Sequence, residues 1–204
     1  MIGIIDYGLG NVRAFENIYR RLNIEVRLVR SAEELEVADR LILPGVGAFD
    51  WAITRLEKSG MNEALNRRVL SDLVPILGVC VGMQMMGTRS DEGNMIGLGW
   101  IPGRVKRFDE TKFNQRTHLP HMGWNSVEVT QQGSLFDGID NPQFYFLHSY
   151  FFDPDDAIHA IAYSDYGVQF PAAIRCDNVW ATQFHPEKSH HWGIHLLKNF
   201  ADKT

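Results

Sequence analysis

The first 84 residues alternate short apolar runs with segments whose apolar side chains recur at helical spacing. The apolar runs occupy residues 2–5, 25–29, 40–43 and 75–79. Between the first two runs, apolar residues recur three or four positions apart from Val12 to Leu22, which is the spacing of one helix face. Repeated strand and helix units pack as a parallel sheet with helices on both faces. The chain is therefore predicted to be a doubly wound α/β protein.

Residues 99–129 break this alternation. Turns and short alternating strands replace the strand–helix rhythm there, which predicts an antiparallel extension of the mostly parallel sheet. Two later apolar runs, residues 144–147 and 178–184, are predicted strands. No repeat, low-complexity run or linker divides the 204 residues, so we expect a single domain over residues 1–204.

Charge and cysteine usage exclude several classes of function. A formal net charge of −5 argues against a general nucleic-acid binder. The two cysteines, Cys80 and Cys176, belong to no CxxC pair or secretory framework, so a structural disulfide is not expected and Cys176 is interpreted as a spectator. The N-terminus enters a strand pattern directly and carries no signal-like segment, which favours a cytoplasmic protein.

The fourth strand ends in a candidate nucleophile elbow, Gly78-Val79-Cys80-Val81-Gly82. In such a strand–turn–helix motif the nucleophile occupies a strained turn, and glycines let the neighbouring backbone approach closely. A cysteine at the start of a helix is favoured as thiolate, and the next backbone N–H can face an oxyanion. The alternative is tight strand–helix packing around a buried, inert cysteine.

The segment Gln183-Phe184-His185-Pro186-Glu187 offers the histidine that a catalytic cysteine needs. In an extended segment, residues two apart share a face. Glu187 is therefore predicted to hold one imidazole nitrogen of His185 while the other faces Cys80, which makes a Cys-His-Glu triad.

Together with Pro44-Gly45-Val46-Gly47, these two motifs closely resemble the triad-type (class I) glutamine amidotransferases. The segments 119–125 and 148–150 resemble the glutaminase subunits of imidazole glycerol phosphate synthase, and the similarity covers nearly the whole chain. The resemblance implies hydrolysis of glutamine to glutamate and ammonia through a cysteinyl thioester. It also implies that the ammonia is channelled to a (β/α)8-barrel cyclase subunit, in a heterodimer that forms imidazole glycerol phosphate and AICAR in histidine biosynthesis. No cofactor is implied.

The oxyanion hole is expected at two backbone segments. The Val81 N–H follows the nucleophile directly, and the Val46-Gly47 segment follows the third strand at the sheet edge where α/β proteins place their ligands. The glycines around Val46 permit either orientation of a peptide there. The alternative for this segment is a plain β-turn into the next helix.

The resemblance also implies the glutamine-binding residues, which are Gly45, Gln84, Glu92, Ser149 and Tyr150. Gln84 follows Cys80 by one helical turn and lies on the same face. Glu92 would receive the α-ammonium group, with an ordinary solvated glutamate as the alternative. The backbone at Ser149 and Tyr150 would hold the α-carboxylate, whereas His148 is interpreted as a hydrogen-bonded structural histidine.

The resemblance also implies a surface that docks the cyclase partner, and exposed aromatic and methionine residues are typical of interface hot spots. Its expected members are Asn11, Pro120, Met122, Trp124, Tyr145 and Lys188. Two alternatives remain open: Asn11 as a helix cap, and Trp124 as a filler of the core.

Other motifs are weaker. Gly8-x-Gly10 has Arg13 where a dinucleotide fingerprint needs glycine, so nucleotide binding is not predicted. His191 and His195 have metal spacing without a third ligand, so no metal site is predicted and an exposed helix start is preferred. Three other functions compete: a glutaminase that feeds a sugar-amidating enzyme of surface-polysaccharide synthesis, a hydrolase of peptides or γ-glutamyl conjugates, and a regulatory binding subunit with an inactive site.

Overall fold

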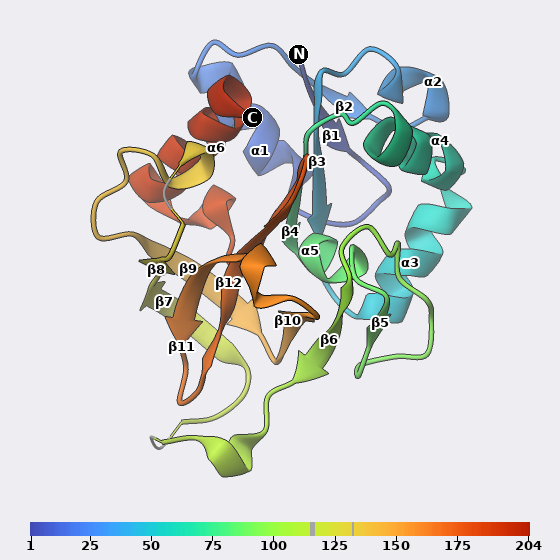
Figure 1. Ribbon diagram of the computed structural model, residues 1–204. Helices are drawn as coiled ribbons and strands as arrows, with labels where there is room; N and C mark the ends of the chain where they lie inside the picture. The colour runs from blue at the N-terminus through green and yellow to red at the C-terminus, as the bar shows by residue number, and fades with distance from the viewer. Residues whose placement is uncertain (115–116, 132) are drawn as a thin grey trace.

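The computed structural model describes residues 1–114, 117–131 and 133–204. Over these residues the chain forms an eight-stranded central sheet, flanked by helices (Figure 1). From one edge to the other its strands are β2 (Val26–Val29), β1 (Ile2–Ile5), β3 (Arg40–Gly45), β4 (Ile76–Cys80), β13 (Val179–Thr182), β12 (Gln169–Cys176), β11 (Ala160–Asp165) and β8 (Glu128–Val129).

Strands β2, β1, β3, β4 and β13 run parallel, and β12, β11 and β8 continue the sheet antiparallel. Every residue of β1, β4 and β13 is buried, as expected for parallel strands covered on both faces. The predicted doubly wound, mostly parallel sheet with an antiparallel extension is confirmed.

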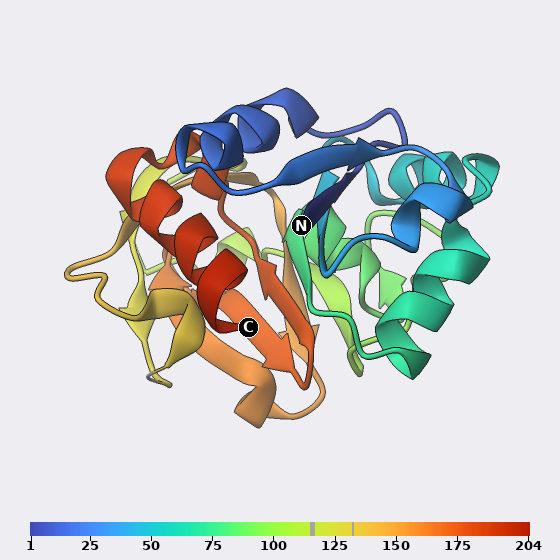
Figure 2. The same cartoon turned by 90° about the horizontal axis from the view of Figure 1, so that it is seen from above.

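Helices cover both faces of this sheet (Figure 2). On one face, α1 (Val12–Arg21) packs beside α6 (His190–Lys203), and the buried Tyr19 hydroxyl donates to the Leu197 carbonyl at 3.0 Å. The other face carries α2 (Ala32–Leu35), α3 (Phe49–Lys58), α4 (Asn62–Asn66) and α5 (Val81–Met85). Helix α4 ends at Asn66 and is followed directly by a π-helical turn over Arg67–Ser71. None of the helices in the described part of the chain is long and apolar enough to cross a membrane.

The antiparallel extension comes mainly from a different part of the chain than expected. Within residues 99–129, Gln115 and Arg116 lie outside the described residues. Among the described strands of this segment, β8 joins the central sheet. The strands β6 (Gly103–Arg107), β5 (Arg89–Ser90) and β10 (Tyr150–Pro154) form a second sheet, and β7 (His121–Ser126) pairs with β9 (Gln143–His148). Short turns join β11, β12 and β13, so these strands pair with their neighbours in sequence, and β13 takes the place beside β4.

The carboxyl ends of the parallel strands meet at one edge of the sheet. Gly45 at the end of β3 is in register with Cys80 at the end of β4. On the other side of β4, Thr182 of β13 is in register with Val79, so the chain continues from β13 into Gln183 and His185 beside the cysteine. The topology thus brings the three sequence motifs together at the edge where open α/β sheets bind ligands.

Candidate active site

Cys80 occupies a strained backbone conformation, with φ of 55° and ψ of −112°. Few residues other than glycine adopt a positive φ, and such outliers concentrate at functional sites. Two glycines make room for the turn: a Cβ on Gly82 would lie 1.9 Å from the Leu43 carbonyl oxygen, and one on Gly78 would lie 2.6 Å from Cε of Met86. The turn therefore has the geometry expected of a nucleophile elbow.

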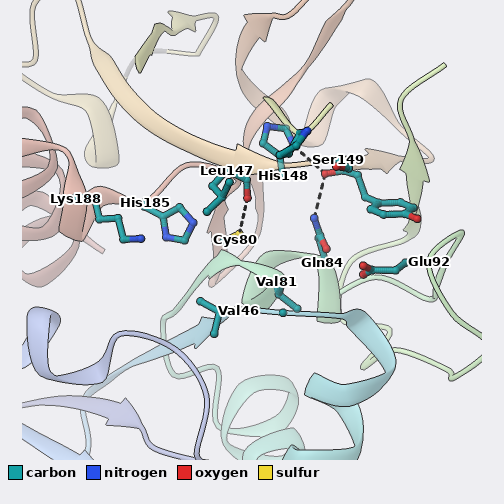
Figure 3. A pocket seen from close by; sticks show the side chains of 13 residues that line it. Val46, Cys80, Val81, Gln84, Glu92, Leu147, His148, Ser149, His185 and Lys188 are labelled. Atoms are coloured by element: carbon teal, nitrogen blue, oxygen red, sulfur yellow. Dashed lines mark hydrogen bonds between the residues drawn. The ribbon is translucent and has the colours of Figure 1, made fainter. Parts of the chain in front are cut away.

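The Cys80 side chain faces a cavity of about 310 Å³ (Figure 3). This cavity brings together residues from the ends of β3 and β4, the start of α5, the loop after β9 and the turn after β13. The residues that line it are Val46, Gly47, Cys80, Val81, Gln84, Glu92, Pro120, Leu147, His148, Ser149, Tyr150, His185 and Lys188. All of the predicted catalytic, oxyanion and substrate residues lie here except Gly45 and Glu187.

Glu187 lies behind His185, and the two side chains are joined by a hydrogen bond of 3.0 Å between Nδ1 of His185 and Oε1 of Glu187. The expected extended conformation is wrong, because Pro186–Lys188 form a 3₁₀ turn, η5. Pro186 favours this outcome, since its fixed φ suits the first position of a helical turn. The predicted pairing of the two side chains nevertheless forms.

The electrostatic surroundings favour the protonated form of the His185 imidazole. Burial alone would lower the pKa of His185, but interactions with Cys80 and Glu187 outweigh it and raise the pKa to about 10. Because Nδ1 of His185 donates to the Glu187 carboxylate, Nε2 is the ring nitrogen that can exchange a proton with Cys80. The other oxygen of Glu187, Oε2, is buried and has no hydrogen-bond partner among the described residues.

The backbone of His185 is fixed by strand β9. Its N–H donates to the Tyr145 carbonyl oxygen at 2.8 Å. The buried Ser189 hydroxyl donates to the His185 carbonyl at 2.6 Å and accepts from the Tyr145 N–H at 3.0 Å. Ser189 was not identified from the sequence, because its role depends on a strand 44 residues away along the chain.

Two further groups contact the Cys80 sulfur. The Leu147 carbonyl oxygen lies 3.9 Å from it, and Nε2 of Gln183 lies 3.8 Å from it (Figure 3 shows the contact with Leu147). Neither residue was predicted to have a role at the site. Gln183 stands within a motif used for the prediction, but only the fold shows that its side chain turns toward the cysteine.

The predicted substrate residues differ in their placement. Gln84 is buried at the cavity wall and donates to the Tyr150 carbonyl oxygen at 3.1 Å. Glu92 is half-buried and accepts from the Phe49 N–H at 2.9 Å, which holds its carboxylate at the start of α3. Gly45 lies behind the elbow, where a Cβ would come within 2.3 Å of the Gly82 nitrogen. Glycine is needed at this position because the start of α5 approaches so closely. Gly45 does not line the cavity.

Two of the predicted interface residues, Pro120 and Lys188, line the cavity, and the other four lie outside its lining. Met122 and Trp124 are 64% and 42% exposed on β7, so the alternative of Trp124 as a core filler is wrong. Trp124 lies opposite Tyr145 of β9, and the Lys188 ammonium lies 5.8 Å from the Tyr145 ring. Asn11 is exposed at the N-cap position of α1, but its side chain makes no capping hydrogen bond. Pro120 is exposed at the cavity rim.

The remaining candidates lie apart from the cavity. Cys176 is half-buried at the end of β12, where burial and the nearby Asp177 raise the pKa of its thiol. His191 is exposed at the start of α6 and contacts the Trp192 ring in a tilted arrangement, with ring centroids 4.0 Å apart. In residues 1–114, 117–131 and 133–204, no cluster of three or more side chains could hold a metal ion.

Comparison with known proteins agrees with this geometry. The family model of class-I glutamine amidotransferases matches residues 3–204, and the chain therefore belongs to that family. A solved structure described as a glutamine amidotransferase superposes with a TM-score of 0.75 over 98% of both chains, at 22% identity. The structure of PurLQS from Thermotoga maritima gives a TM-score of 0.74 over 98% of this chain and 96% of its own, at 15% identity, and both likenesses concern the fold.

Sequence relatives narrow the assignment. The chain is 51% identical to the imidazole glycerol phosphate synthase subunit HisH of Bdellovibrio bacteriovorus, over 99% of this chain and 100% of that protein. It is 46% identical to the HisH subunit of Leptospira interrogans, over 98% of this chain and 99% of that protein. Identity of this extent over complete lengths places the chain in the HisH group of the family.

Proposed function

We propose that this chain is the glutaminase subunit of an imidazole glycerol phosphate synthase. It hydrolyses glutamine to glutamate and ammonia, and passes the ammonia to a cyclase subunit in histidine biosynthesis. The observation that carries the proposal is the strained Cys80 elbow in one cavity with His185, whose Nδ1 is held at 3.0 Å by Glu187. Nucleophile, base and orienting carboxylate are the parts of a triad.

In the first half of the reaction, the Cys80 thiolate attacks the side-chain amide carbon of glutamine. The C–N bond of the resulting tetrahedral intermediate then breaks, and the proton on Nε2 of His185 goes to the departing nitrogen, which leaves as ammonia. The product on the enzyme is a thioester between Cys80 and the glutamyl group. Glu187 keeps the imidazole in the required tautomer throughout by accepting from Nδ1.

In the second half, His185 removes a proton from water, and the resulting oxygen attacks the thioester carbonyl. The C–S bond breaks, glutamate leaves, and the thiolate is restored beside the protonated imidazole. Both tetrahedral intermediates carry an oxyanion. The Val81 N–H at the start of α5 and an N–H of the Val46-Gly47 segment are its proposed donors, because both segments line the cavity next to Cys80.

Substrate recognition follows from the polar groups around the cavity. Glu92 supplies a carboxylate for the α-ammonium group, and the Ser149-Tyr150 backbone lies on the cavity wall for the α-carboxylate. Nε2 of Gln84 donates to the Tyr150 carbonyl and to Oε1 of Gln183, so Oε1 of Gln84 is the group that is proposed to face the substrate. This set of groups fits an amino acid that carries both charges and has a side-chain amide directed at Cys80.

The cyclase is proposed to dock on the face formed by Asn11, Pro120, Met122, Trp124, Tyr145 and Lys188. Exposed Trp and Met residues beside a cavity are characteristic of an interface core. Docking there would cover the mouth of the cavity, so that ammonia passes to the partner without entering bulk water, where it becomes unreactive ammonium.

Reconstitution with the purified cyclase tests this function. The pair should form imidazole glycerol phosphate with glutamine as nitrogen donor, whereas the cyclase alone should need added ammonium salt. Failure of this chain to replace ammonium, despite complex formation, would contradict the proposal. Glutamine-dependent amidation with a sugar-amidating enzyme, and none with the cyclase, would favour the alternative of a glutaminase for surface-polysaccharide synthesis.

A further inference from the structure

The carbonyl oxygen of Tyr150 accepts two hydrogen bonds inside the protein. Nε2 of Gln84 donates to it at 3.1 Å, and Nδ1 of His148 donates at 2.8 Å (Figure 3). A backbone carbonyl can only accept, so the group that Gln84 turns toward Tyr150 must be its NH₂. This contact therefore fixes which way the Gln84 amide points.

The orientation of Gln84 fixes that of Gln183. The same Nε2 of Gln84 lies 3.1 Å from Oε1 of Gln183. If the Gln183 amide were reversed, two NH₂ groups would face each other with no acceptor between them. Gln183 must consequently turn its own NH₂ to the other side, where the Cys80 sulfur lies 3.8 Å away.

We propose that Gln183 is a fixed hydrogen-bond donor to the Cys80 sulfur and stabilises its thiolate form. The inference rests on the proposed function, because it concerns the same nucleophile. Gln183 is fully buried, so water does not replace its N–H when the sulfur becomes charged. The Leu147 carbonyl oxygen lies 3.9 Å from the sulfur and favours the thiol form of Cys80, and the Gln183 N–H counteracts that effect.

Gln183 differs from the other groups that act on Cys80. His185 supports the thiolate as a cation, but it gives up its proton during each turnover. The Tyr7 side chain is buried nearby, is neutral, and donates to the Pro44 carbonyl at 2.8 Å. Gln183 carries no charge and exchanges no proton, so its contribution is present in every step in which sulfur is an anion or a leaving group.

The pH dependence of Cys80 alkylation tests the proposal without requiring glutamine turnover. Iodoacetamide reacts with the thiolate, forming a carbon–sulfur bond and releasing iodide, so the rate follows the thiolate fraction. Peptide-resolved mass spectrometry separates Cys80 from Cys176, and Cys176 serves as the internal reference for reagent and folding. The rates would be measured on the complete chain over a range of pH.

Two substitutions distinguish a donor from a packing residue. Gln183→Met keeps the volume and removes the donor, and should raise the apparent pKa of Cys80 by about one unit, a roughly tenfold lower alkylation rate below that pKa. Gln183→Glu keeps the shape and the acceptor for Gln84 but replaces NH₂ by a carboxylate oxygen, and should raise the pKa further. A packing role would instead leave Gln183→Glu close to the wild type.

An unchanged Cys80 profile in Gln183→Met, with unchanged Cys176 reactivity and circular dichroism, would overturn the proposal. So would a Gln183→Glu profile that matches the wild type. If Gln183→Glu does not fold, Gln183→Met alone decides between the outcomes. The result is separate from the fate of the proposed function: an inactive chain could still show the shift, and an active glutaminase without it would remove only the role of Gln183.

Discussion

The Tyr145 carbonyl oxygen accepts the backbone N–H of His185 at 2.8 Å, which ties the candidate base to strand β9. Tyr145 is also paired with Trp124 on β7, the exposed strand of the proposed interface. Two residues farther along β9, the Leu147 carbonyl lies beside the Cys80 sulfur. One strand therefore contacts the base, the nucleophile and the surface where a partner would dock.

Ser189→Ala tests how strictly this backbone arrangement is required. The change removes the bonds of 2.6 Å to the His185 carbonyl and 3.0 Å from the Tyr145 N–H, and it leaves buried groups unpaired. We expect a loss of about 1–3 kcal/mol in the free energy of unfolding and a lower kcat with little change in KM. Denaturant unfolding and steady-state glutaminase assays measure both, with the exposed Ser71→Ala as control. Wild-type kcat in Ser189→Ala would contradict the expectation.

Cys80→Ala should abolish glutamine hydrolysis, because no other group in the cavity can form the thioester. Partner binding and ammonia-dependent synthesis should remain intact, since neither uses the sulfur. Cys176→Ala is the matched control and should be almost silent, because Cys176 lies at the end of β12 away from the cavity. Glutaminase activity near wild type in Cys80→Ala, or its loss in Cys176→Ala, would show that the nucleophile has been assigned wrongly.

Glu187→Gln should lower turnover less than His185→Ala does. The glutamine can still accept from Nδ1 of His185, although its NH₂ would occupy the buried position where Oε2 now lacks a partner. His185→Ala removes the proton carrier itself, which costs on the order of 10⁴-fold or more in kcat in related triads. Single-turnover assays with glutamine compare the two variants. Equal or greater damage from Glu187→Gln would reverse this assignment of roles.

The buried pair His121 and His148 should make the protein less stable in acid. Nδ1 of His148 donates to the Tyr150 carbonyl, so its Nε2 accepts from Nδ1 of His121 at 3.0 Å. Nε2 of His121 in turn accepts from Nδ2 of Asn125 at 3.3 Å, so each ring carries one proton and its second nitrogen already accepts a hydrogen bond. Burial lowers the pKa of His121 to about 4, and burial together with His121 lowers that of His148 to about 3. Both rings are therefore neutral in the folded protein at neutral pH.

The sign of the pH effect follows from linkage. Below about pH 6.5 the unfolded chain binds protons at these positions and the folded chain does not, so stability falls as pH falls toward about 4. The slope is at most about 1.4 kcal/mol per pH unit for each histidine. His185, whose pKa is raised to about 10, acts in the opposite sense and loses its contribution as pH rises through that value.

Urea unfolding of the wild type between about pH 5 and about pH 7.5 measures the acid slope. His148→Asn keeps an N–H donor for the Tyr150 carbonyl and removes a titrating ring, so its slope should be shallower. Substitution of the exposed His118 by Gln should leave the slope as it is. Identical slopes for His148→Asn and the wild type would show that His148 titrates normally in the folded state.

Local patterns were sufficient to predict most of the fold and to name the residues of the proposed triad. The strand at residues 2–5, the helix from Val12 and the elbow at Cys80 each follow from apolar spacing or from glycines that the backbone requires. Parallel strands share one carboxyl edge, so the topology alone brings Cys80 and His185 together. These features depend on neighbours within a few residues or on rules common to all such sheets.

The parts that sequence reasoning missed depend on contacts between distant segments. Whether Gln183 turns toward Cys80 is decided by Gln84 and Tyr150, which lie far away in the sequence. The Ser189 bridge and the Leu147 carbonyl depend on how β9 packs against the turn after β13. The conformation of Pro186–Lys188 was mispredicted because the two-residue spacing of His185 and Glu187 fits an extended strand and a 3₁₀ turn equally well.

The Val46-Gly47 peptide is the expected point of control by the partner. Gly47 has φ of +85°, a conformation that favours glycine, and a Cβ there would meet no atom within 4 Å. We expect the isolated chain to be a poor glutaminase whose oxyanion hole is formed in only a minor population. Docking of the ligand-bound cyclase on the Trp124 face should shift that population, since β7 is paired to the strand that holds His185 and lies beside Cys80.

One oxyanion donor contributes about 2.7–4 kcal/mol, so the partner should raise kcat by roughly 10²–10³-fold. Steady-state glutaminase assays with and without the purified cyclase and its substrate measure this increase. Trp124→Ala should weaken it, because it removes the largest exposed side chain of β7. The matched control is Leu70→Ala, which truncates a side chain that is 54% exposed in the segment before β4, at the opposite end of that strand from Cys80. High activity of the lone chain that no partner improves would exclude this form of control, and equal effects of the two substitutions would place the docking surface elsewhere.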